Sequence, residues 1–180
     1  MGAIRQATPA RTGVWVGIAT ISMSFAAYTS AMVARQGAAP DWLHFQLPPI
    51  LYFNTMVLLA SSGTLELSRR RIADAAGRYW LGVTLALGMV FVTGQVLAWR
   101  DLAAQGLYLG TSPSSAFVYV FTVLHALHLL GGIVALVYVL LRLRRLSGPR
   151  PTGALGAVAL YWHFMDALWL YLLLVLTIRL

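Results

Sequence analysis

Five long apolar runs, separated by short segments that contain arginine, organise the 180-residue chain. They cover residues 13–34, 47–67, 79–99, 117–141 and 156–178. A helix of about 20 apolar residues crosses a bilayer core, and backbone in lipid must pair its own polar groups. The pattern therefore predicts an all-α membrane protein, a single domain in which five transmembrane helices form a bundle. The runs are continuous and do not alternate with polar residues, which excludes a transmembrane β-barrel.

The composition supports a chain that lies mostly in lipid. Hydrophobic residues make up 59% of the chain and charged residues only 10%, against about 25% charged in an average soluble domain. This excludes a disordered chain, a nucleic-acid-binding arm and an ordinary soluble enzyme. The chain has no cysteine, so disulfides, thiolate metal sites and a nucleophilic cysteine are excluded as well.

The basic residues predict the orientation in the membrane. All thirteen are arginine, and the net charge is +8. Because cytoplasmic loops carry an excess of basic residues, we expect the N-terminus in the cytoplasm and the C-terminus outside, with the first run an uncleaved helix. The ten arginines that would share the cytoplasmic side are Arg5, Arg11, Arg69, Arg70, Arg71, Arg78, Arg142, Arg144, Arg145 and Arg150.

Tryptophan lies at or near several ends of the apolar runs, namely at Trp15, Trp80, Trp99 and Trp162. Tryptophan is enriched where a membrane meets water, because its ring is apolar and its N–H group is polar. We therefore expect these four side chains to anchor the helices at the two interfaces.

Few ionisable residues lie at membrane depth. His125 and His128 share a helical face in the fourth run, and His163 and Asp166 do so in the fifth. We expect Asp166 to pair with His128 or His163, so that the four form an interhelical polar network, since an unpartnered buried charge costs several kcal/mol. Histidines at this spacing also bind metals or haem, as in a b-type cytochrome. No compact set of three or four ligands accompanies them, so we predict no metal, cofactor or catalytic site in the chain.

Other polar residues follow stripes along the second and third runs. Glu66 faces either a polar groove with Thr55 and Ser62 or, as we favour, Arg69 and Arg70 within one helical turn. Such residues join helices more often than they catalyse. Ser61, Thr84 and Gly88 belong to these stripes, and we expect lipid or subunit contacts at Asn54, Thr55, Ser62, Glu66 and Gln95.

Four segments resemble subunit III of the haem–copper respiratory oxidases, the cytochrome c oxidase subunit III family. They read LPPILYFNTMVLLASSGT, GQVLAWRDL, FTVLHALHLLGG and YWHFMDALWLYLLL, and together they span residues 47–174. Their order and spacing agree with the family pattern. The five runs are similar to the short bacterial form of the subunit, which lacks the first two of seven helices.

The resemblance implies a non-catalytic subunit of a prokaryotic inner-membrane complex. Its main partner would be oxidase subunit I, which holds the haems and copper, reduces oxygen to water and pumps protons. Subunit II is a second implied partner, with a small subunit IV or a larger respiratory supercomplex as further candidates and no nucleic acid. The implied roles are to stabilise the catalytic subunit, to support proton uptake and to bind phospholipid between helices.

Two positions depart from the family pattern. Many relatives carry a glutamate in the first helix, where residues 19–23 here contain no carboxylate, and another near the position of Ala98. Two alternatives remain open at this point: an accessory subunit of a nitric oxide reductase, and a small proton-coupled transporter that would use Asp166. The electron donor, cytochrome c or quinol, is determined by other subunits.

Overall fold

Five helices account for nearly all of the chain that the structure describes. The computed structural model describes residues 9–38, 40–72, 74–145 and 152–180, and no strand occurs in these ranges. The helices are α1 (Pro9–Ala38), α2 (Ile50–Arg70), α3 (Ala75–Ala104), α4 (Pro113–Arg145) and α5 (Thr152–Arg179). Each is long and apolar enough to cross a membrane, so the predicted all-α membrane bundle is confirmed.

The helices extend beyond most of the predicted runs, because helical hydrogen bonding continues into the polar interface where hydropathy falls. The exception is the start of α2, which we predicted at residue 47 and which the structure places at Ile50. Pro48 and Pro49 have no backbone N–H group and precede the first turn. Their carbonyl groups accept hydrogen bonds of 3.0 Å from Leu51 and 3.1 Å from Tyr52.

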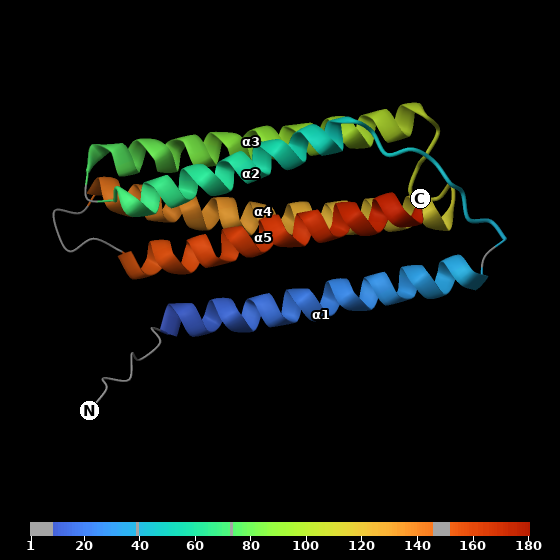
Figure 1. The fold of residues 1–180 in the computed structure, drawn as a ribbon, viewed down its shortest axis with the longest axis horizontal. Coiled ribbons are helices and arrows are strands. Elements are labelled where there is room, and N and C mark those ends of the chain that lie inside the picture. The colour runs from blue at the N-terminus through green and yellow to red at the C-terminus, as the bar shows by residue number, and fades with distance from the viewer. Residues whose placement is uncertain (1–8, 39, 73, 146–151) are drawn as a thin grey trace.

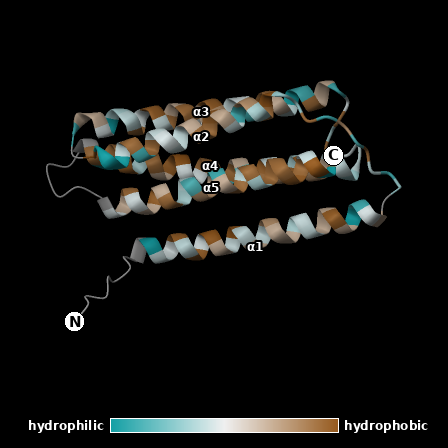
Figure 2. Ribbon diagram, in the orientation of Figure 1, coloured by the Kyte–Doolittle hydropathy of each residue, from teal (hydrophilic) through white to brown (hydrophobic). Residues whose placement is uncertain are grey.

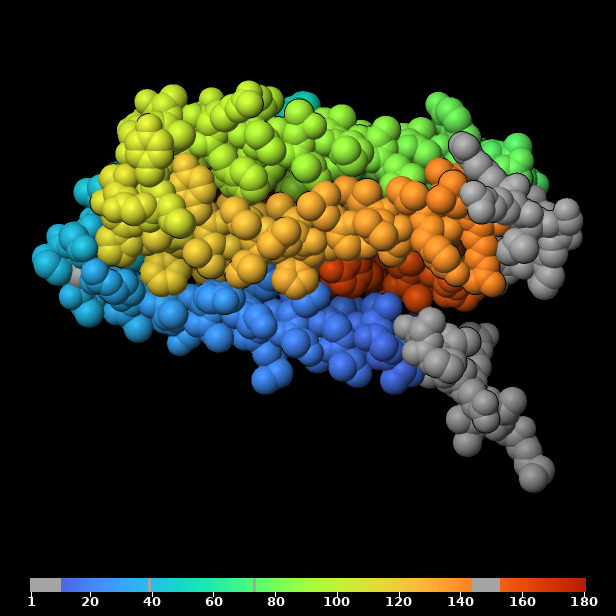
Figure 3. All heavy atoms as spheres, turned by 180° about the vertical axis from the view of Figure 1, so that it is seen from behind, coloured from blue at the N-terminus to red at the C-terminus, as the bar shows by residue number. Residues whose placement is uncertain are grey.

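Helix α5 occupies the centre of the arrangement and contacts α1, α2 and α4. Helices α2 and α3 form the most extensive pair, whereas α1 contacts only α4 and α5 (Figure 1). One face of the bundle presents α2 and α5 (Figure 1), and the view from behind shows α3, α4 and α1 (Figure 3). The start of α1 and the end of α5 lie at opposite ends of the bundle.

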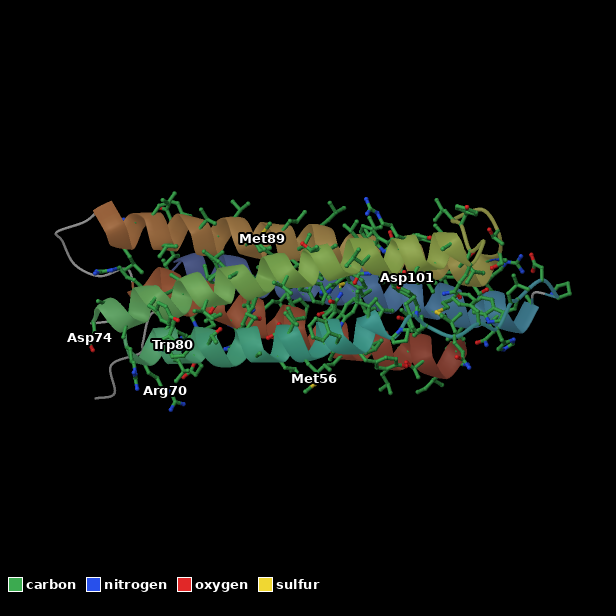
Figure 4. The ribbon with its side chains drawn as sticks, turned by 90° about the horizontal axis from the view of Figure 1, so that it is seen from above. Met56, Arg70, Asp74, Trp80, Met89 and Asp101 are labelled. Carbon is green, nitrogen blue, oxygen red and sulfur yellow. The ribbon has the colours of Figure 1, made fainter. Side chains whose placement is uncertain are left out.

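The outer surface of the bundle is largely apolar, as a lipid environment requires. Hydrophobic residues dominate the middle of the helices, and hydrophilic ones mark both ends of α1 (Figure 2). Met56 on α2 and Met89 on α3 point away from the bundle (Figure 4), with 67% and 52% of their surfaces exposed. Asp74 and Asp101 lie at opposite ends of α3, so the charges of this helix lie outside its apolar middle.

A glycine ends α3 and turns the chain toward α4. Gly106 adopts a φ of 75°, a conformation that residues with a side chain rarely adopt. The N–H group of Leu107 donates a hydrogen bond of 3.0 Å to the carbonyl oxygen of Leu102, and both leucines are buried. This closes the C-terminus of α3 before Pro113 begins α4.

Candidate functional site

The polar residues of α2 and α5 meet along the edge where these helices pack together. The hydroxyl group of Ser62 and the Nδ1 atom of His163 share a hydrogen bond. One turn further along α2, Glu66 accepts hydrogen bonds from Arg69 at 2.7 Å and from Arg70 at 3.1 Å. The favoured interpretation of Glu66 is therefore confirmed: it pairs with arginines at the end of its own helix.

Asp166 lies on the same edge, and its carboxyl group is nearly enclosed. Only 5% of the residue is exposed, and neither carboxylate oxygen has a hydrogen-bond partner among the described residues. Ser62 neighbours this carboxyl group, but its hydrogen bond goes to His163. The predicted pairing of Asp166 with His128 or His163 is wrong. The ring of His163 is hydrogen-bonded to Ser62 on α2, and that of His128 to the carbonyl oxygen of Leu124 on its own helix.

The two histidines of α4 also do not join Asp166. His128 contacts its own helix, since its Nδ1 atom lies 2.7 Å from the carbonyl oxygen of Leu124. His125 is fully buried against the rings of Phe91 and Trp169, at centroid distances of 5.9 Å and 5.0 Å. Neither ring nitrogen of His125 has a described hydrogen-bond partner. The four residues that we expected to form one hydrogen-bonded network thus occupy three separate environments.

Three of the five predicted lipid or subunit contacts lie inside the bundle. Asn54, Thr55 and Gln95 are 0%, 9% and 1% exposed, so the expectation that they face lipid or another subunit is wrong for them. Asn54 donates to the carbonyl oxygen of Phe91 at 3.4 Å, and Thr55 accepts a hydrogen bond of 2.9 Å from the indole of Trp169. These residues join α2 to α3 and α5. Ser62 and Glu66 are half-buried at the outer edge.

The structure also overturns the expected place of one tryptophan. Trp162 is fully buried and does not anchor an interface. Its Nε1 atom donates a hydrogen bond of 3.0 Å to the hydroxyl oxygen of Ser61, and its ring packs against Gly88 and Gly132. The seven-residue spacing between Trp162 and Trp169 was the available signal, because it places both indoles on one helical face.

Two further contacts join neighbouring helices. Of the four residues that make them, only Thr84 belonged to the polar stripes described from the sequence. The hydroxyl groups of Thr64 on α2 and Thr84 on α3 lie 2.9 Å apart. Trp99 on α3 donates to the hydroxyl oxygen of Thr122 on α4 at 3.0 Å. Ser, Thr and Trp side chains therefore connect successive helices around the bundle, as is common in membrane proteins.

Residues 19–25 of α1, which contain no carboxylate, present apolar and aromatic residues to the bundle. Ile21 and Phe25 are buried there. The ring of Phe25 lies 6.3 Å from that of Phe121 and 6.0 Å from that of His128. Thr20 and Ser24 are exposed and bond only carbonyl groups of α1. Packing of α1 against α4 thus depends on aromatic contacts.

The described part of the chain contains no group of three or more histidine or carboxylate side chains that could hold a metal ion. Among the described residues, polar side chains meet mostly in pairs between helices, and the hydroxyl of Ser62 with the imidazole of His163 is one such pair. This geometry is that of a multi-pass membrane subunit whose polar side chains hold helices to one another.

Comparisons with known proteins agree on the family. A family model described as cytochrome c oxidase subunit III matches residues 18–179. A probable cytochrome c oxidase subunit 3 of Mycobacterium tuberculosis is 31% identical over 161 residues, which cover 84% of this chain and 77% of the relative. The cytochrome c oxidase subunit 3 of Thermostichus vulcanus is 31% identical over 180 residues, 92% of this chain and 85% of the relative. That of Synechocystis is 30% identical over 168 residues, 91% and 68% of the two chains.

The chain belongs to the cytochrome c oxidase subunit III family. It is a subunit III of a haem–copper oxidase and associates with other subunits of that oxidase in a membrane. The family match and the resemblance in the four sequence segments agree with each other.

Proposed function

We propose that the chain is a non-catalytic subunit that stabilises the catalytic subunit of a proton-pumping terminal oxidase. One observation carries the proposal: several polar side chains at membrane depth join one helix to another, such as Trp162 to Ser61 and Trp169 to Thr55. Haem and copper belong, in this proposal, to the partner subunits. The implied partners are oxidase subunit I and subunit II.

Support for proton uptake and binding of phospholipid between helices are part of the same proposal. An apolar hollow between α1 and α4, lined by Tyr28, Tyr119, Val123 and Leu124, suits an acyl chain. Asp166 lies in the middle of α5, whereas α1 contains no aspartate or glutamate. In this proposal the chain supports proton uptake by stabilising the catalytic subunit. A carboxylate of α1 takes no part, because α1 contains none.

Deletion of this chain from the oxidase tests the proposal. Because the redox centres are assigned to the partners, electron transfer should begin at the normal rate after deletion. The oxidase should then inactivate sooner during turnover, and its proton-to-electron ratio should fall. Immediate loss of haem reduction in a correctly assembled remainder would contradict an accessory role. Restoring the chain should restore the lifetime, which controls for damage during preparation.

We also propose that the N-terminus of the chain faces the cytoplasm in the prokaryotic plasma membrane. The support is the arginine-rich end of the bundle, where Arg69 and Arg70 lie in the last turn of α2, Arg71 follows it, and Arg78 lies in the first turn of α3. A cysteine introduced at Arg78 in this cysteine-free chain should resist a membrane-impermeant maleimide applied to intact spheroplasts. A cysteine at Gly110, at the other end of α3, should react. The reverse pattern would contradict the orientation.

A further inference from the structure

The carboxyl group of Asp166 differs in its surroundings from the other acidic side chains. The sequence contains five aspartate and glutamate residues. Four of them lie at or near helix ends: Asp41 and Glu66 are in ion pairs with arginine, and Asp74 and Asp101 are exposed. Asp166 alone lies in the middle of a helix, α5, which is one of the five that are apolar enough to cross a membrane.

The structure encloses this carboxyl group without a charge to balance it. Asp166 is 5% exposed, and both of its carboxylate oxygens are buried without a hydrogen-bond partner among the described residues. None of the ion pairs between described residues includes Asp166. An isolated ionised carboxylate in apolar surroundings costs so much free energy that the group takes up a proton instead.

The helices packed against α5 supply no cation to Asp166. These helices are α1, α2 and α4 (Figure 1). Residues 12–34 of α1 contain no charged residue and no histidine. On α2, the two arginines of the last turn are paired with Glu66. On α4, His128 bonds a carbonyl group of its own helix, and His125 lies against aromatic rings.

The hydroxyl group of Ser62 on α2 is a polar neighbour of the Asp166 carboxyl group. It also shares a hydrogen bond with the Nδ1 atom of His163. A serine hydroxyl has one proton to donate and two lone pairs that accept. If Ser62 donates its proton to His163, it meets the carboxyl group only as an acceptor. A carboxylic acid fits this arrangement because its O–H group donates, whereas a carboxylate has no proton to donate.

We infer that Asp166 is a proton-binding site inside the bundle: its carboxyl group holds a proton and donates it in a hydrogen bond to Ser62. Ser62 in turn donates to Nδ1 of His163, whose own proton lies on Nε2. The three side chains form one directed chain of hydrogen bonds, from the interior of α5 through α2 to the half-buried ring of His163. Every member is neutral, so no ionised group lies unpaired in apolar surroundings.

The opposite direction of the same hydrogen bonds is the competing arrangement. In it, Nδ1 of His163 donates to Ser62, and Ser62 donates to an ionised Asp166. That carboxylate would have a single neutral donor and no cation, although a buried charge needs a paired and hydrogen-bonded environment. The two arrangements differ in where the proton lies, and spectroscopy separates them.

Infrared spectroscopy of the full chain tests whether Asp166 holds a proton. The chain is purified in a maltoside detergent, which has no carbonyl group, and is measured at neutral pH. A carboxylic acid has a C=O band that is well separated from the bands of carboxylates. We expect this band in the unaltered chain and in the control Asp74→Asn, whose replaced carboxyl group is exposed. We expect no such band in Asp166→Asn, in which an amide N–H group donates to Ser62 instead. Absence of the band from the unaltered chain, or its persistence in Asp166→Asn, would overturn the inference.

A second variant tests the hydrogen bond from Asp166 to Ser62. Ser62→Ala removes the acceptor, so the C=O band should move to higher frequency, as it does when a carboxylic acid loses a hydrogen bond. Ser24→Ala is the matched control and should leave the band unchanged, because Ser24 bonds only its own helix. Circular dichroism establishes that each variant keeps its helices before the spectra are compared. A band that Ser62→Ala does not move, or a proton on Nδ1 of His163 in nitrogen NMR, would overturn the assigned direction of the chain.

Discussion

The indole nitrogen of Trp162 on α5 donates a hydrogen bond of 3.0 Å to the hydroxyl oxygen of Ser61 on α2. The same ring packs against Gly88 of α3 and Gly132 of α4. One side chain thus contacts three neighbouring helices in the interior. Its N–H group needs a partner there, because an unpaired donor in an apolar interior is costly.

Removal of the Ser61 hydroxyl should weaken the bundle measurably. Ser61→Ala leaves the Trp162 donor without its partner, and we expect a loss of about 0.6 kcal/mol, up to about 1.7 kcal/mol, as for other hydrogen bonds between membrane helices. Reversible unfolding of the chain in mixed micelles measures this loss. Ser24→Ala is a matched control, because Ser24 is exposed and bonds only Thr20 of its own helix. Equal stability of the two variants would contradict the role of the hydrogen bond.

Substitution at Gly94 should separate α2 from α3. A Cβ atom at this position would overlap the side-chain amide of Asn54, which is fully buried and bonded to Phe91. Gly94→Val should destabilise the chain by about 1–3 kcal/mol, as overpacking of a dense interior does. Gly82→Val on the same helix should cost much less, because a Cβ atom there meets no other atom within 4 Å. The difference in unfolding free energy between the two variants is the quantity to measure.

Neutralisation of Glu66 should have little effect on stability. Its ion pairs with Arg69 and Arg70 lie at the helix end, where the Arg70 side chain is 74% exposed. Exposed ion pairs contribute about 0.2–1 kcal/mol. We therefore expect Glu66→Gln to change the unfolding free energy by less than about 1 kcal/mol, and by less still at high salt. A larger loss would indicate that Glu66 has a partner other than these arginines.

Substitution of Asp166 by asparagine should not destabilise the free chain. Because its carboxyl group has no hydrogen-bond partner among the described residues, Asp166→Asn breaks no such contact within the chain. We expect the thermal stability of the isolated chain in detergent to stay equal or to rise. Marked destabilisation of the isolated chain would show that an ionised Asp166 has an internal partner after all.

The membrane fold could be predicted from the sequence because lipid imposes a simple rule. Backbone in hydrocarbon must pair its own polar groups, so a long apolar run becomes a helix whatever its neighbours are. The five runs and the pairing of Glu66 with arginines one turn away both depend on short distances along the chain. The four family segments likewise lie within single runs.

The partners of the buried polar residues were decided only by the tertiary structure. Spacing showed that His163 and Asp166 share a face of one helix, but the packing of α5 placed His163 against Ser62 and left the Asp166 oxygens without a hydrogen-bond partner among the described residues. The sequence alone also placed Trp162 at an interface, whereas the glycines of α3 and α4 admit its ring into the interior. A run of residues determines that a helix forms. Which of its sides meets which neighbour depends on how all the helices pack together.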